Sequence, residues 1–222
     1  TNPHTQLPIA YHPPREAAQV TTMKSIAAPV TSDPAAARRA LRATAIAARE
    51  ALSEETREVL TGRLVAHLER LFDDLRPACV AFCWPWRGEA DLRAWLAAWL
   101  DAAAERSAAL PAVLDKNAPL TFRGWRPGME LAVDCHGIPY PARGPAVRPD
   151  VVLVPLNAFD GEGYRLGYGG GYFDRTLAVL DTVAVGVGFE CGRTGSVFPQ
   201  PHDRPMDWLV TEAGVFAPRA AR

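Results

Sequence analysis

The apolar segment DVVLVP at 150–155, with the glycine cluster that follows it at 167–171, constrains the fold of this chain most. A short continuous apolar run is typical of a strand buried on both faces of a parallel sheet. ACVAFCW at 78–84 and TVAVGVGF at 182–189 have the same character. Because parallel strands are joined by long crossover connections, usually helical, the pattern predicts helices between these strands.

Helical patterns are found where such a sheet requires them. Ser32 or Asp33 before Pro34 indicates a helix start, and this first helix is expected to run to about Ala51. Further helices are expected at 54–72, 91–105 and 172–180, and further strands at 108–114, 120–125 and 208–211. The alternation predicts an α/β fold with three layers, α/β/α, around a mostly parallel open, Rossmann-like sheet. Ligands bind such sheets beyond the carboxyl ends of the strands.

The domain organisation is expected to be simple. A chain of 222 residues can be served by one hydrophobic core, and we place a single α/β domain at 33–217. Residues 1–32 hold several prolines and few large apolar side chains, which predicts a disordered N-terminal extension. Residues 218–222 are expected to form a flexible C-terminus.

Charge and composition exclude several classes of partner. The formal net charge of -1 offers no basic field for nucleic acid, and no run approaches the roughly 20 apolar residues that span a bilayer. The first residues lack the pattern of a secretion signal, so we expect a cytoplasmic monomer that binds neither nucleic acid nor membrane. The four cysteines form no C-x-x-C pair and are expected to be small buried hydrophobic residues rather than zinc ligands.

The glycine cluster is the strongest candidate for a binding loop. Gly167, Gly169, Gly170 and Gly171 lie between a predicted buried strand and a predicted helix, where each glycine weakens regular structure by roughly 0.5–1 kcal/mol. Such loops allow backbone N–H groups to approach phosphate oxygens closely. A tight structural turn is the alternative. The loop is neither a Walker A motif nor a dinucleotide fingerprint, because no Gly-Lys-Ser/Thr follows and Tyr172 takes the place of the third glycine.

Two charged residues flank the glycines. Arg165 is a permanent cation suited to a polyphosphate, and the carboxylate of Asp174 could hold magnesium against those phosphates.

The string FDGEGYRLGYGGGYFDRTL at 159–177 closely resembles the signature of 5-formyltetrahydrofolate cyclo-ligases. Other pieces occur in the order of that family: RRALR at 38–42, WPWRGEADL at 84–92, IPYP at 138–141 and HDRPMDWLVT at 202–211. The resemblance extends from about Pro34 to Thr211. It implies an ATP- and Mg²⁺-dependent enzyme that converts 5-formyltetrahydrofolate to 5,10-methenyltetrahydrofolate, with release of ADP and phosphate.

The resemblance also implies roles for individual residues. The implied ATP-binding residues are Arg38, Arg39, Arg42, Arg165, Gly167, Gly169, Gly170, Gly171, Tyr172 and Phe173. The implied folate-binding residues are Trp84, Glu89, Tyr168, Gly169, Gly170, Gly171 and Tyr172. Arg165 and Tyr172 would be catalytic, and Asp174 and Asp203 would hold the metal.

The residues alone leave other interpretations open. Taken alone, the arginines at 38–42 are typical of a solvated helix face, and Asp203 is typical of an ordinary loop. Glu89 would serve as an acid at a helix start, where the helix dipole stabilises it. Three residues depart from the family pattern: Arg38 replaces a lysine, Phe173 replaces a tyrosine, and His136 replaces an aromatic pocket residue.

Two other functions compete with the cyclo-ligase. One is a family relative that binds nucleotide or folate in a regulatory or salvage role without catalysis. The other is a sugar-phosphate isomerase or CoA-transferase relative that uses a similar sheet for a phosphorylated ligand and needs no ATP.

Overall fold

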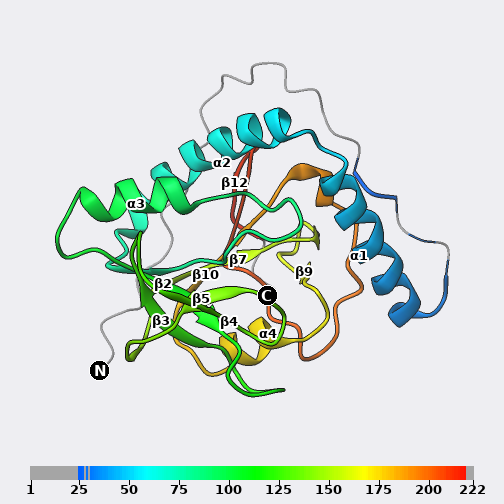
Figure 1. The fold of residues 1–222 in the computed structure, drawn as a ribbon. Helices are drawn as coiled ribbons and strands as arrows, with labels where there is room; N and C mark the ends of the chain where they lie inside the picture. The colour runs from blue at the N-terminus through cyan, green and yellow to red at the C-terminus, as the bar shows by residue number, and fades with distance from the viewer. Residues whose placement is uncertain (1–24, 28, 30, 219–222) are drawn as a thin grey trace, which may run out of the picture.

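A computed structural model describes residues 25–27, 29 and 31–218. Its centre is an eight-stranded sheet with the order β12-β11-β10-β7-β1-β2-β3-β6 (Figure 1). The five strands from β11 to β2 are mutually parallel, and antiparallel strands complete both edges. The bounds are β1 Cys79–Ala81, β2 Ser107–Ala112, β3 Thr121–Trp125, β6 Ala146–Val147, β7 Val151–Pro155, β10 Val183–Val187, β11 Trp208–Thr211 and β12 Gly214–Phe216.

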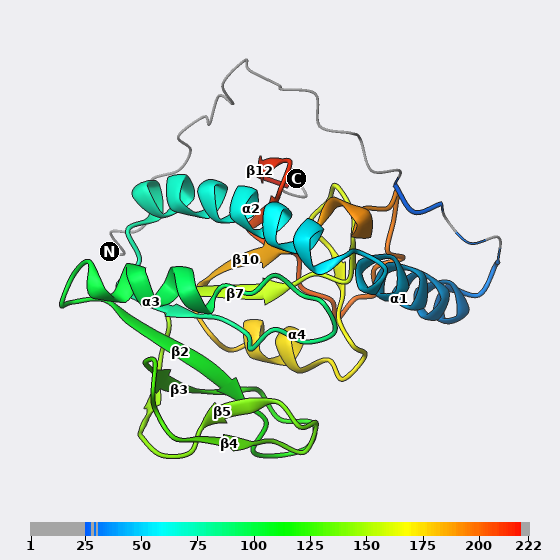
Figure 2. The same cartoon turned by 45° about the horizontal axis from the view of Figure 1, so that its top comes forward.

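Helices cover both faces of this sheet, as the sequence predicts. Figure 2 shows α2 (Glu54–Leu75) and α3 (Arg93–Asp101) on one face of the strands and α4 (Tyr172–Leu177) on the other. Successive side chains of β7 point to opposite faces of the sheet, so this strand contacts both helical layers. Leu153 packs in the cluster under α2 and α3, and Val154 packs toward α4. The three-layer α/β/α fold with a mostly parallel open sheet is therefore confirmed.

The helix α1 (Pro34–Glu50) lies at the side of the sheet. Its start follows the predicted capping pattern, because the side chain of Asp33 accepts a hydrogen bond from the N–H of Ala35 at 2.9 Å. Leu41 and Ala45 are buried in a cluster of their own, against the hairpin of β8 (Ala158–Phe159) and β9 (Arg165–Leu166). The opposite face of α1 is free to carry polar side chains.

Several boundaries differ from the predicted ones. The third and fourth helices end at Asp101 and Leu177, earlier than the expected 105 and 180. The apolar run at 78–84 forms only a three-residue strand. A hairpin of β4 (Leu131–Val133) and β5 (Pro139–Pro141), and a short 3₁₀ helix η1 (Glu190–Gly192), have no counterpart among the predicted elements.

Most of the predicted N-terminal extension lies outside the described residues, so its disorder stays a prediction. Ile26 is described, and it forms a bridge with Thr194 and donates a 2.8 Å hydrogen bond to the carbonyl of Arg193. All four cysteines are free. Only Cys191 among them is buried as expected, since Cys79 and Cys83 are half-buried and Cys135 is exposed. None of the helices in the described part of the chain has the length and hydropathy needed to cross a bilayer.

Candidate active site

A cavity of about 700 Å³ opens at the carboxyl ends of the parallel strands. Cys83 follows β1, Val113 follows β2 and Pro155 ends β7, and all three line it. Every site residue expected from the sequence lines the same cavity: Arg38, Arg39, Arg42, Trp84, Glu89, Arg165, Gly167, Tyr168, Gly169, Gly170, Gly171, Tyr172, Phe173, Asp174 and Asp203. The structure thus brings together residues from both ends of the described chain.

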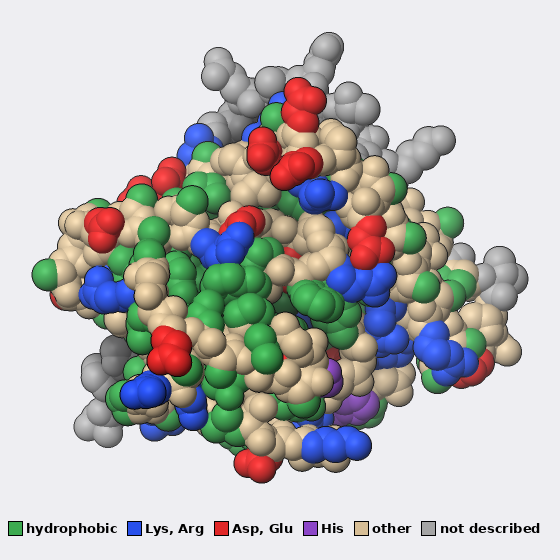
Figure 3. Space-filling view, in the orientation of Figure 1, with side chains coloured by type: hydrophobic (Ala, Val, Ile, Leu, Met, Phe, Trp, Pro, Cys, Tyr) green, Lys and Arg blue, Asp and Glu red, His purple; other side chains and the backbone are tan. Residues whose placement is uncertain are grey.

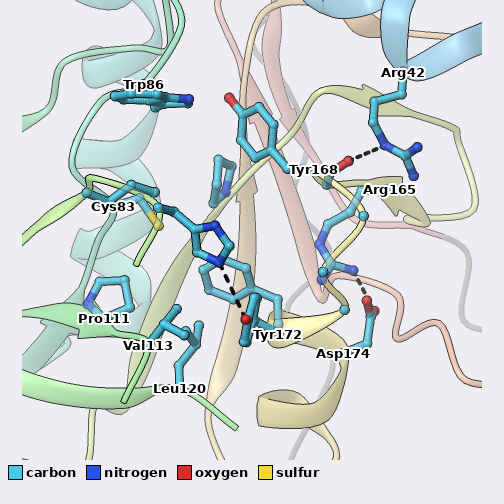
Figure 4. A pocket seen from close by; sticks show the side chains of 18 of the residues that line it. Arg42, Cys83, Trp86, Pro111, Val113, Leu120, Arg165, Tyr168, Tyr172 and Asp174 are labelled. Carbon is cyan, nitrogen blue, oxygen red and sulfur yellow. Dashed lines mark hydrogen bonds and ion pairs between the residues drawn. The ribbon is translucent and has the colours of Figure 1, made fainter. Parts of the chain in front are cut away.

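The cavity has two chemically different sides. Figure 4 shows Arg42, Arg165 and Asp174 on one side and Cys83, Pro111, Val113 and Leu120 on the other, with Tyr172 between them. In the space-filling view, hydrophobic side chains gather in the middle of this face and Lys or Arg side chains gather toward α1 (Figure 3). A ligand with an anionic part and an apolar ring system would match both sides.

The glycine loop runs from Gly167 to Gly171 and borders the charged side. Gly169 has φ of +101°, a conformation that residues with a side chain rarely adopt. At Gly170, a Cβ atom would lie 2.7 Å from the ring of Tyr172, so only glycine lets that ring approach the loop. The helix α1 holds this loop in place, because Nε of Arg42 donates a 2.7 Å hydrogen bond to the carbonyl of Gly167.

Arginines on α1 supply positive charge beside this loop. Arg38, Arg39 and Arg42 all line the cavity, and the spacing of Arg38 and Arg42 places them one helical turn apart. Burial lowers the pKa of Arg42, and the charge of Arg38 adds to this effect. Among the described residues, no carboxylate lies within ion-pair distance of Arg42, so its charge remains available for an anion.

The two predicted metal carboxylates are each paired with an arginine. Asp203 accepts hydrogen bonds from both terminal nitrogens of Arg38, at 2.6 and 3.1 Å, and from the N–H of Gln200 at 2.7 Å. Burial opposes ionisation of Asp203, but these donors hold its pKa below the ordinary value. Asp174 accepts through Oδ1 from Arg165 at 3.0 Å and from the N–H of Arg204 at 3.1 Å.

These contacts decide how well a magnesium ion fits. Both oxygens of Asp203 are occupied by Arg38, whereas Oδ2 of Asp174 receives no hydrogen bond from the described residues. No group of three or more His, Cys, Asp or Glu side chains among those residues is placed to hold a metal. Magnesium is commonly held by one or two carboxylates together with substrate phosphates. Asp174 fits that role as it stands, and Asp203 would fit it only after release of Arg38.

On the apolar side of the cavity, Glu89 supplies a buried carboxylate. Its side chain is 10% exposed, and burial raises its pKa, while the charge of Arg49 and the hydroxyl of Tyr168 oppose the rise. Trp84 lines the cavity nearby, with the guanidinium of Arg93 4.5 Å from its ring centroid. A buried carboxylate in apolar surroundings is suited to binding the N–H groups of a heterocycle.

His136, expected at the position of an aromatic pocket residue, lines the cavity and faces Tyr172, with Nε2 3.4 Å from the hydroxyl oxygen. Sequence reasoning missed Trp86 and Arg49. Trp86 stands exposed at the cavity wall. Arg49 is buried behind Glu89 and does not line the cavity. Arg49 lies seven residues after Arg42 and therefore on the same face of α1. This helical spacing could have identified it from the sequence.

The fold and the cavity define a class: an open-sheet α/β protein with a glycine loop beside arginine side chains, next to an apolar pocket. A sequence model of the 5-formyltetrahydrofolate cyclo-ligase family matches residues 34–212. The chain therefore belongs to the 5-formyltetrahydrofolate cyclo-ligase family.

Similar proteins with known sequences carry the same name. The 5-formyltetrahydrofolate cyclo-ligase of Escherichia coli K12 is 34% identical over 105 residues, covering 44% of this chain and 58% of that protein. The protein of that name from Mycolicibacterium smegmatis is 35% identical over 109 residues, covering 46% of this chain and 56% of its own length. The chain thus spans less than two thirds of the length of these relatives.

Solved structures extend the likeness over the whole fold. The 5,10-methenyltetrahydrofolate synthetase of Aquifex aeolicus has a TM-score of 0.72 and 33% identity, covering 83% of this chain and 94% of that one. The synthetase of Mycoplasma pneumoniae has a TM-score of 0.64 over 79% of this chain and 98% of that one, and its 22% identity supports the fold alone.

Proposed function

We propose that this protein uses ATP to convert 5-formyltetrahydrofolate to 5,10-methenyltetrahydrofolate, with release of ADP and phosphate. One observation carries the proposal. A single cavity joins a glycine loop flanked by arginines to an apolar pocket with a buried carboxylate, so a triphosphate and a reduced pterin would meet inside it. Membership of the family supports the same reaction and favours it over the isomerase or CoA-transferase alternative.

The reaction proceeds in two steps. The formyl oxygen attacks the γ-phosphorus of ATP, and the bond from that phosphorus to ADP breaks. The neighbouring secondary amine of the folate then adds to the formyl carbon and loses its proton, and phosphate leaves as the ring closes. Because the substrates supply both nucleophiles, the protein needs mainly to position them and to stabilise charge on the phosphoryl group.

The cavity contains residues for each of these tasks. Arg39 and Arg42 would bind the outer phosphates, because neither has a carboxylate within ion-pair distance among the described residues. Arg165 is buried beside the loop and would stabilise the transferring phosphoryl group. Tyr172 lies between the charged and apolar sides, where its ring can hold the formyl end of the folate against the phosphate (Figure 4).

Magnesium is proposed on the basis of Asp174, whose Oδ2 has no protein donor among the described residues. A bound Mg²⁺ ion would neutralise phosphate charge. Asp203 would join it when an incoming phosphate draws Arg38 away. The ion pairs of Arg38 and Arg165 thus hold the site together in the absence of nucleotide, and phosphates and metal would replace the partners of each pair.

The experiment is a direct assay. Purified protein is mixed with 5-formyltetrahydrofolate, ATP and MgCl₂, and the near-ultraviolet absorbance of the methenyl product is followed. Product is expected with wild type and not with Asp174→Ala, while Asp181→Ala, an exposed aspartate outside the cavity, serves as the matched control. Removal of the metal with EDTA is expected to stop the reaction, and excess MgCl₂ to restore it.

Folate binding without turnover would instead support the alternative of a non-catalytic relative. That alternative draws on Phe173, which lacks the hydroxyl of the tyrosine it replaces. A cytoplasmic, monomeric protein that acts on small molecules rather than nucleic acid is what the sequence predicts, and this stays a prediction.

A further inference from the structure

The side chain of Arg49 is buried at the end of α1, where it joins three segments that surround the cavity. It is 3% exposed, and its Nη1 donates to the side-chain oxygen of Asn157 at 2.7 Å and to the carbonyl of Leu156 at 3.3 Å. Its Nε donates to the carbonyl of Arg87 at 3.0 Å, and its Nη2 to the hydroxyl of Tyr168 at 2.8 Å. One guanidinium therefore connects the end of β7, the loop after β1 and the glycine loop.

The hydroxyl of Tyr168 transmits this contact to Glu89. A guanidinium can only donate, so the hydroxyl accepts from Arg49 and directs its own proton to Oε1 of Glu89, 2.7 Å away. The other oxygen of Glu89 accepts from the backbone N–H of Trp86 at 3.1 Å. Each oxygen thus has one protein donor, and the orientation of the carboxylate in the cavity is fixed from two sides.

The charge of Glu89 depends on the same contacts. Burial raises its pKa, while Arg49 and Tyr168 lower it, so ionisation is a balance between these effects. The other titratable groups near it do not supply positive charge: burial raises the pKa of the Cys83 thiol, which stays neutral, and Arg87 is paired with Glu50. Arg49 is the cation nearest to Glu89, at 3.9 Å from Oε1.

We infer that Arg49 is a positioning residue that, through the hydroxyl of Tyr168, fixes the Glu89 carboxylate as the acceptor for the N–H groups of the bound pterin. The inference rests on the proposed function, because it assigns Glu89 to the folate. Arg49 itself does not line the cavity, so its effect on the folate would pass through the other two residues.

Tyr168→Phe is the decisive variant, since it removes only the hydroxyl from a side chain that is 41% exposed and should fold normally. Arg49→Lys is the second, because lysine keeps the charge but not the forked set of donors. Tyr164→Phe, outside the cavity, is the matched control. Two quantities are measured: the titration of the Glu89 carboxyl by ¹³C NMR without ligand, and the pH profile of kcat/KM for 5-formyltetrahydrofolate.

Loss of the hydroxyl is expected to move the Glu89 titration to higher pH. The acid limb of kcat/KM for the folate should move with it, and KM for the folate should rise about tenfold, the loss expected for one hydrogen bond to a charged group. KM for ATP should not change. An unmoved Glu89 titration in Tyr168→Phe would overturn the inference. The two proposals can fail separately. If the Glu89 titration moves in Tyr168→Phe but the wild-type protein binds no folate, the role of Arg49 and Tyr168 in holding Glu89 is supported and the proposed function is refuted.

Discussion

Arg165 and Asp174 lie at opposite ends of the glycine loop and are joined by a 3.0 Å ion pair. The pair brackets the loop, and both side chains are largely buried, at 4% and 18% exposure. A charge pair in this position has a structural role as well as the proposed role in binding.

Replacing Asp174 by asparagine should therefore destabilise the protein. The charge of Arg165 would be left buried without a counter-ion, and we expect a loss of about 2–3 kcal/mol in the free energy of unfolding, less than for a fully buried pair because Asp174 is partly exposed. Urea unfolding measures this loss, with Asp181→Asn as the control. An unfolding midpoint equal to that of wild type would show that the pair is not stabilising.

Arg42→Gln should weaken nucleotide binding without unfolding the protein. Its terminal nitrogens face the cavity without a carboxylate partner among the described residues, so a phosphate would gain a charge-assisted hydrogen bond there. We expect Kd for ATP with MgCl₂ to rise about 10- to 100-fold, as for loss of one such bond. Calorimetric titration tests this, with Arg70→Gln on α2 as the control. Equal affinities in the two variants would contradict it.

Gly170→Ala should impair the reaction more than the fold. The added Cβ would lie 2.7 Å from the ring of Tyr172, which must then move within the cavity. Gly195→Ala is the matched control, because nothing lies within 4 Å of its Cβ position. The expected result is at least about a tenfold lower kcat for Gly170→Ala, as misplaced reacting groups produce, with the thermal midpoint little changed. Wild-type kcat would show that the ring position is unimportant.

The ion pair of Asp203 should give a characteristic pH dependence. Because the pKa of Asp203 is lower in the folded protein than its ordinary value of 3.8, its contribution to stability is present above that value. This contribution is lost as the pH falls through the folded-state pKa. Urea unfolding between about pH 2 and pH 6 should therefore show a shallower acid limb for Asp203→Asn than for wild type. Identical slopes would rule out this role.

Local patterns predicted much of the fold. Continuous apolar runs placed the central strands, and the capping signal before Pro34 placed the start of α1, where Asp33 is the cap. The β4–β5 hairpin was missed because its strands, at 131–133 and 139–141, are only three residues long and mostly half-buried or exposed, too short to show an apolar period. The ends of α3 and α4 were placed too late and the end of α2 too early, because tertiary context overrides local helix propensity.

The site residues were predicted from the resemblance, but their partners could not be. The contacts of Arg38 with Asp203 and of Arg49 with Asn157 join residues 165 and 108 positions apart. No local spacing contains such pairs, because they form only when α1 packs beside the ends of the strands. Burial of Arg49 likewise depends on the complete fold, so its role could be inferred only from the structure.

The helix α1 sets the distance between the two halves of the cavity. Arg38 contacts the charged side and Arg49 supports the carboxylate on the other, and the helical rise separates their Cα atoms by about 16 Å. A single residue inserted between them would rotate one arginine by about 100° about the helix axis relative to the other, so that both could no longer reach their present partners. Relatives that bind the same pair of ligands should therefore tolerate substitutions along this helix but no change in its length.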